Sequence, residues 1–132
     1  MKKMISIIFL FTIMLLAACS GQEKGELTRV DVLIENQGEI HIQDKDTLVE
    51  IENIFEQIKW SPNTVVNMAR KADVKTIFFY TFDENMPERL VEYEIWFNEN
   101  ADTAEIVSNN EKEGYGELDK DNTNTLRKIL LK

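Results

Sequence analysis

Apolar and polar positions alternate over residues 29–43, with a break at the turn residues 36–38. Side chains of a strand point alternately to its two faces, so the pattern predicts a half-buried hairpin. From residue 47 to 59 the apolar positions recur at helical spacing instead, which predicts an amphipathic helix. The apolar stripe of that helix would consist of Leu48, Ile51, Ile54, Phe55 and Ile58.

Several residues are candidates for the N-cap of this helix. Asp44, Asp46 and Thr47 are all good N-caps, and Thr47 with Glu50 fits the capping box S/T-x-x-E. The helix should end before Pro62, because the residue preceding a proline is disfavoured in the α region.

Four further strands are expected at residues 74–82, 90–97, 104–108 and 115–118. The first of them is apolar on both faces, which is typical of a central strand. Residues 63–72 fit either a helical turn or a packed loop.

A final helix follows the capping residues 119–123, with Leu126, Ile129 and Leu130 at core spacing. The order of elements predicts an α+β fold, an antiparallel β-sheet of one hairpin plus a meander, packed with one internal and one C-terminal α-helix. A single domain over residues 27–132 is expected.

The N-terminal segment has a different character. Lys2 and Lys3 precede an uncharged run that reaches residue 18, shorter than the roughly 20 residues a membrane-spanning helix needs. This pattern predicts a signal peptide over residues 1–18.

The end of that run, Leu16 to Cys19, matches the lipobox of bacterial lipoproteins. The match implies cleavage before Cys19 and a diacylglycerol on its sulfur, with residues 19–26 as a polar tether. The expected location is therefore the extracytoplasmic face of the cell membrane. The alternative is an uncleaved anchor in which Cys19 has no role.

Charge and composition exclude several function classes. With 15 Lys and Arg against 24 Asp and Glu, the net charge is −9, which argues against nucleic acid as a partner. One Cys and one His leave little for a disulfide, a zinc site or a His-dependent triad.

No local motif predicts a catalytic, metal or cofactor site. His41 lies between two core-facing positions and is expected to face solvent. The segment starting at Asp119 does not match an EF-hand calcium loop, because Asn124 and Leu130 occupy the positions where that loop requires Gly and Glu.

An exposed contact with a partner is expected on the strand at 90–97. Trp96 shares a strand face with Glu92 and Glu94, opposite the apolar set, and an outward Trp beside acids would suit a protein interface. The alternative is that a helix covers this face. A ligand groove could also be lined by Trp60, Trp96 and the aromatic cluster Phe78, Phe79, Tyr80, Tyr93 and Phe97.

The segment Tyr93–Phe97, Tyr115 and the final helix resemble the small YhfM-like lipoproteins of Bacillus-type bacteria. The resemblance covers about residues 27–131 and departs at 61–72. It implies the same fold and membrane location, and it carries no catalytic residues because these proteins have no assigned reaction.

These observations together predict a non-catalytic, membrane-anchored lipoprotein that binds or assists another component of the cell envelope. The alternative is a lipoprotein receptor for a solute or an ion. Carboxylate catalysis by Glu92 and Glu94 is disfavoured, because glutamates alternating along one strand usually form its solvated face.

Replacement of the lipobox cysteine tests the anchoring. Cys19→Ala should leave an unprocessed precursor without lipid, because the thioether bond needs the cysteine sulfur. Metabolic labelling with a fatty acid and the mass of the membrane-bound protein measure both properties. Normal maturation of Cys19→Ala would contradict the lipobox assignment.

Overall fold

The first alternating stretch forms the expected hairpin in the computed structural model, which describes residues 25–131. Strand β1 (Glu26–Ile34) pairs antiparallel with β2 (Gly38–Ile42). Val30 lies opposite Ile42 in this register, and Val30 is fully buried. The apolar face of β1 therefore belongs to the core, as the alternation predicts, whereas Ile40 of β2 is 42% exposed.

Helix α2 (Lys45–Glu56) begins and ends slightly earlier than the predicted range 47–59. Asp44 is its N-cap, and its carboxylate accepts the Thr47 N–H at 3.0 Å and the Thr47 hydroxyl at 2.7 Å. Asp44 therefore takes the position for which three residues competed, and Thr47 lies inside the first turn. The predicted stripe is buried at Leu48, Ile51, Ile54 and Phe55.

The sheet has seven antiparallel strands in the order β2-β1-β4-β5-β6-β7-β3. Strand β3 was not predicted: the chain leaves α2 and pairs with β7 at the edge opposite the hairpin, with Trp60 facing Gly116. Helix α2 therefore connects the two edges of the sheet. The other strands are β3 (Lys59–Ser61), β4 (Val74–Thr81), β5 (Arg89–Asn98), β6 (Thr103–Ser108) and β7 (Tyr115–Leu118).

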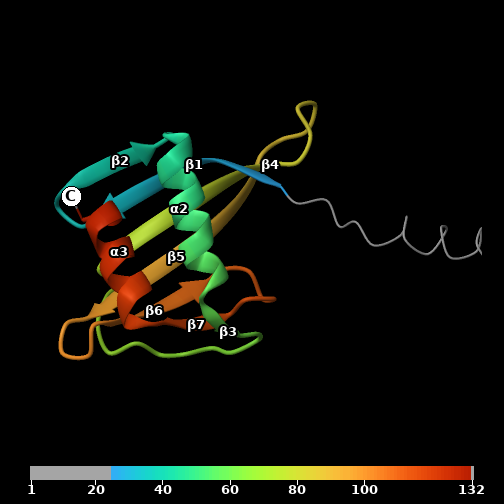
Figure 1. The fold of residues 1–132 in the computed structure, drawn as a ribbon. Coiled ribbons are helices and arrows are strands. Elements are labelled where there is room, and N and C mark those ends of the chain that lie inside the picture. Colours follow the sequence, from blue (N-terminus) through green and yellow to red (C-terminus); the bar gives the residue numbers. More distant parts are fainter. Residues whose placement is uncertain (1–24, 132) are drawn as a thin grey trace, which may run out of the picture.

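Both helices lie across one face of the sheet (Figure 1). Helix α3 (Lys120–Leu130) begins at the N-cap Asp119, as predicted, and buries Leu126 and Leu130. The core forms between these helices and the inward strand residues, which include Phe78, Ile95 and Ile106. An α+β fold with an antiparallel sheet and two helices is therefore confirmed.

The segment between β3 and β4, residues 62–73, contains neither helix nor strand. This region is therefore a loop and not a helical turn, but most of it does not pack as expected, since Val65 is 93% exposed. Over residues 25–131, no helix has the length and apolarity to cross a bilayer.

A core substitution tests the packing of α2. Ile54 is 3% exposed, so Ile54→Ala should lower the free energy of unfolding by about 2–5 kcal/mol through lost burial and a cavity. Urea denaturation measures this change. The neighbouring Asn53→Ala, at an exposed position of the same helix, should stay within about 0.5 kcal/mol of the wild type. Equal effects of the two variants would contradict the assigned face.

Candidate functional site

Two hollows open at opposite ends of β5, on the side of the sheet that the helices cover. The aromatic groove has a volume of about 450 Å³ and the arginine pocket one of about 900 Å³. The groove is lined by Gly25, Glu52, Phe55, Glu56, Tyr80, Phe82, Arg89, Val91, Tyr93, Asn110 and Glu113. The pocket is lined by Arg70, Asp73, Phe97, Asn98, Glu99, Asn100, Ala101, Arg127 and Leu131.

The aromatic groove is built on a cluster of packed rings around Tyr93. The centroid of the Tyr93 ring lies 4.7 Å from that of Phe78, 4.8 Å from Phe55 and 5.9 Å from Trp60. Trp60 reaches this position across Gly116, where a Cβ atom would lie 2.7 Å from the indole. The ring contacts therefore fix the position of the Tyr93 hydroxyl.

That hydroxyl belongs to a hydrogen-bond network centred on Glu113. Tyr93 donates to the two oxygens of Glu113 at 2.9 and 3.2 Å, and the Ser108 hydroxyl donates to Oε1 at 2.9 Å. The backbone N–H of Asn110 donates to Ser108 Oγ at 3.0 Å. A carboxylate has about four acceptor sites, so Glu113 is oriented and still has acceptor capacity beside the groove.

The turn between β6 and β7 brings Glu113 to this position. The carbonyl oxygen of Asn110 accepts the N–H groups of Glu113 at 3.0 Å and Gly114 at 2.9 Å. Gly114 has φ of 71°, in the left-handed region that glycine adopts without strain. The turn therefore depends on a glycine directly after the carboxylate.

The phenols of the groove are held in their neutral form. Burial, reinforced by the charges of Glu113 and Glu52, raises the pKa of Tyr80 to about 12. Burial also raises the pKa of Tyr93, and the charge of Glu113 adds to the effect. Both hydroxyls are therefore hydrogen-bond donors at neutral pH.

The mouth of the groove carries charges of both signs. Helix α2 contributes the half-buried Glu52 and the exposed Glu56. The guanidinium of Arg89 lies 4.4 Å from the centroid of the Phe82 ring. The groove therefore combines apolar walls, carboxylates, neutral phenols and one guanidinium. An oriented carboxylate can accept a proton from water, and a neutral phenol can stabilise a developing oxyanion.

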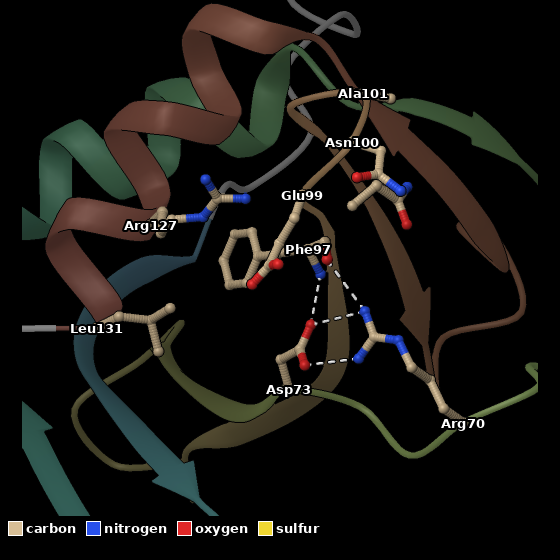
Figure 2. A pocket seen from close by; sticks show the side chains of 9 residues that line it. Arg70, Asp73, Phe97, Glu99, Asn100, Ala101, Arg127 and Leu131 are labelled. Atoms are coloured by element: carbon tan, nitrogen blue, oxygen red, sulfur yellow. Dashed lines mark hydrogen bonds and ion pairs between the residues drawn. The ribbon is translucent and has the colours of Figure 1, made fainter.

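The arginine pocket contains a tightly bound ion pair, shown in Figure 2. Arg70 contacts the two carboxylate oxygens of Asp73 at 2.6 and 3.0 Å and also donates to the Phe97 carbonyl at 3.0 Å. The Phe97 N–H donates to Asp73 at 2.7 Å. Burial acts to raise the pKa of Asp73, but the hydrogen bonds from Arg70 and Phe97 outweigh it and the pKa is lowered. Asp73 is therefore ionised, and its two oxygens accept three hydrogen bonds.

His41 is more closely engaged than its predicted solvent position implies. It is exposed, but its Nδ1 lies 2.6 Å from Oδ1 of the buried Asp31, and Glu39 brings a third metal-ligating group within 4.8 Å. Arg29 Nε already pairs with the same Asp31 oxygen at 2.9 Å. Because this guanidinium occupies the position where a cation would bind, the cluster is better explained as an ion-pair network.

Trp96 does not provide the exposed anchor considered for a partner contact. Its side chain is 5% exposed, and its indole N–H donates to the Arg70 carbonyl at 2.8 Å. The cover is the loop at residues 67–70, and not the helix of the alternative. Sequence periodicity gives the face of Trp96 correctly but contains no information on this loop.

The other predicted site residues lie outside both hollows. Glu92 is half-buried and forms an ion pair with Lys75 at 3.6 Å, and Glu94 is exposed on the same outer face. A partner contact through these acids stays a prediction. Cys19 lies outside the described residues.

Sequence reasoning missed Glu113 and Arg127, and it considered Tyr80 and Tyr93 only as members of an aromatic set. The inward alternation of Tyr93 with Ile95 was a usable signal, because it directs a phenol toward the helices. For Glu113 the signal was a glycine following an acid in a polar loop, which alone is not specific.

Comparison with known proteins yields a structural similarity. No family model matches the chain, and no curated protein matches it significantly. The crystal structure of a thioesterase-like protein from Clostridium sporogenes superposes with a TM-score of 0.56 at 22% identity. The match covers 83% of this chain and 98% of the other. The chain therefore has a fold similar to that of this thioesterase-like protein.

This similarity contradicts two predictions made from the sequence. One was a non-catalytic lipoprotein that binds or assists an envelope component, with a receptor as its alternative; the other was that the chain is not an enzyme. Both rested on the lack of a local catalytic motif. That criterion was insufficient, because the groove draws its polar groups from α2, β4, β5 and the turn after β6.

The neutral phenols lead to a spectroscopic prediction. The chain has three tyrosines, and burial also raises the pKa of Tyr115, together with its hydrogen bond to Glu105. At pH 10–11 the native protein should show little phenolate absorbance, whereas the urea-unfolded chain should be half-ionised near pH 10.

Because the folded state holds these protons more tightly, stability should fall as the pH rises above about 10. Ultraviolet titration with and without urea measures the difference. Coincident native and unfolded titration curves would contradict the buried network.

Proposed function

We propose that the protein hydrolyses acyl thioesters in the aromatic groove. The observation that carries the proposal is the Glu113 carboxylate, oriented by the Tyr93 and Ser108 hydroxyls at the wall of a groove that also contains the neutral phenol of Tyr80. The similarity in fold to a thioesterase-like protein supports this choice among acyl-transfer reactions.

In the proposed reaction, Glu113 accepts a proton from a water molecule whose oxygen attacks the thioester carbonyl carbon. The Tyr80 hydroxyl donates a hydrogen bond to the carbonyl oxygen as negative charge develops on it. The carbon–sulfur bond then breaks, and the leaving thiolate takes up the proton from Glu113. The products are a carboxylic acid and a thiol.

Binding would be divided between apolar and charged contacts. Phe55, Phe82 and Val91 offer apolar surface for the acyl chain. Arg89 at the mouth would contact a negatively charged group on the thiol portion of the substrate, since a guanidinium binds phosphate or carboxylate well.

Activity assays on the purified full-length protein test this proposal. Short- and long-chain acyl-coenzyme A are the probes, and release of the coenzyme A thiol is the signal. Glu113→Gln should lower kcat by at least about 100-fold, because the amide cannot accept the proton. Tyr80→Phe should lower kcat by about 10–100-fold through loss of the oxyanion donor.

The matched control is Glu111→Gln, an exposed acid two positions earlier in the same loop, which should retain wild-type kcat. Glu52→Gln identifies the base: a larger loss than in Glu113→Gln would assign that role to Glu52. Hydrolysis of none of the thioesters by the wild type, or full activity of both Gln variants in the groove, would overturn the proposal.

We further propose that the enzyme is anchored on the outer face of the cell membrane through a lipid on Cys19. The lipobox and the resemblance to YhfM-like lipoproteins support this location. Gly25 lines the groove, and the six steps of the chain from Cys19 to Gly25 span at most about 22 Å at 3.3–3.6 Å each. The anchor would thus hold the groove close to the membrane surface.

A further inference from the structure

We propose that the arginine pocket binds a small molecule through its carboxylate or phosphate group, with Arg127 as the anion-binding residue. Arg127 extends from α3 toward Phe97 at the centre of the pocket (Figure 2). Its Nη2 atom is buried and has no hydrogen-bond partner among residues 25–131. Leaving a buried charged donor unsatisfied is costly, so this atom indicates a missing acceptor.

The carboxylate of Asp73 does not supply that acceptor. Its oxygens receive two contacts from Arg70 and one from the Phe97 N–H, as described above. No ion pair within 4.0 Å joins Arg127 to an acid in the described part of the chain. The pocket lining therefore carries two guanidiniums and two carboxylates, those of Asp73 and Glu99. Arg70 is bound to Asp73, whereas Arg127 acts on Asp73 only at longer range and keeps an unsatisfied donor.

The surroundings of Arg127 favour an oxyanion group attached to a larger molecule. The guanidinium carbon lies 5.1 Å from the centroid of the Phe97 ring, which restricts its orientation. The side chains of Asn98 and Asn100 line the same pocket and offer amide donors. A volume of about 900 Å³ exceeds what a bare inorganic ion fills. A guanidinium binds both carboxylate and phosphate through paired N–H groups.

This site is separate from the proposed hydrolytic groove. Phe97 lines the pocket near the end of β5, whereas Tyr93, four residues closer to the start of the strand, lines the groove. The two hollows share no lining residue. Evidence for or against the thioester reaction therefore does not decide whether the anion site exists.

Isothermal titration of the full-length protein in detergent tests the site. Inorganic phosphate and acetate are the two probes, and sodium chloride keeps the ionic strength constant, because screening alone alters surface electrostatics. The wild type should bind at least one probe saturably. The preferred probe identifies the ligand chemistry as phosphate or carboxylate.

Arg127→Gln should weaken that binding by at least about 10-fold, the effect of losing one charge-assisted contact. The matched control is Lys128→Gln, which removes the same charge from the next, exposed position of α3 and should stay within about 2-fold. Arg127→Lys, which keeps the charge but loses the planar donor pair, should give an intermediate affinity.

Thermal unfolding without ligand shows which variants are folded. If Arg127→Gln does not fold, the affinity of Arg127→Lys is compared with that of the wild type instead. Absence of saturable binding of both probes to the wild type would overturn the proposal. Equal weakening of binding in Arg127→Gln and Lys128→Gln would also overturn the proposal, because the loss of affinity would then be explained by the change in net charge alone. Thioester hydrolysis by Arg127→Gln should equal that of the wild type.

Discussion

The side chain of Tyr93 joins the core of this protein to its candidate active site. Its ring packs against Phe55 and Phe78, and its hydroxyl binds Glu113 in the turn after β6. A buried hydroxyl without a partner would be destabilising, so the ring packing requires the carboxylate to be in place. The carboxylate in turn is oriented by a hydroxyl that the core holds rigidly. Packing and site geometry therefore cannot change separately.

The same strand explains why the molecule has two hollows. Tyr93, Ile95 and Phe97 all point from β5 toward the helices. The two helices cover the middle of this row, at Ile95, more completely than its ends, so a cavity forms near each end. At one end the surrounding elements supply phenols and an excess of carboxylates, and at the other they supply two arginines and two carboxylates. The loop before β4 belongs to the second end, where the Arg70 backbone holds Trp96 and its side chain holds Asp73.

How far the sequence predicts this structure depends on the range of each interaction. The hairpin and the face of α2 follow from local periodicity, and the buried Val30 and Ile54 agree with it. Strand β3 does not follow from local periodicity, because three residues are too few to show an alternation. Its pairing partner, β7, also lies more than fifty positions away in the sequence. Burial of Trp96 and the position of Glu113 likewise depend on irregular loops. The candidate site was therefore less predictable than the fold, since its polar groups come together only through such long-range contacts.

The net charge of −9 constrains how either hollow could bind an anion. A field of this sign repels anionic ligands at long range, so electrostatic steering would not assist their association. Binding would have to depend on a short-range contact with a guanidinium that still has an unsatisfied donor. The groove lining carries three carboxylates, those of Glu52, Glu56 and Glu113, beside one guanidinium, whereas the pocket lining carries two carboxylates and two guanidiniums. The pocket is therefore better suited than the groove to hold an anion by itself, and a substrate of the groove would depend more on its acyl chain for affinity.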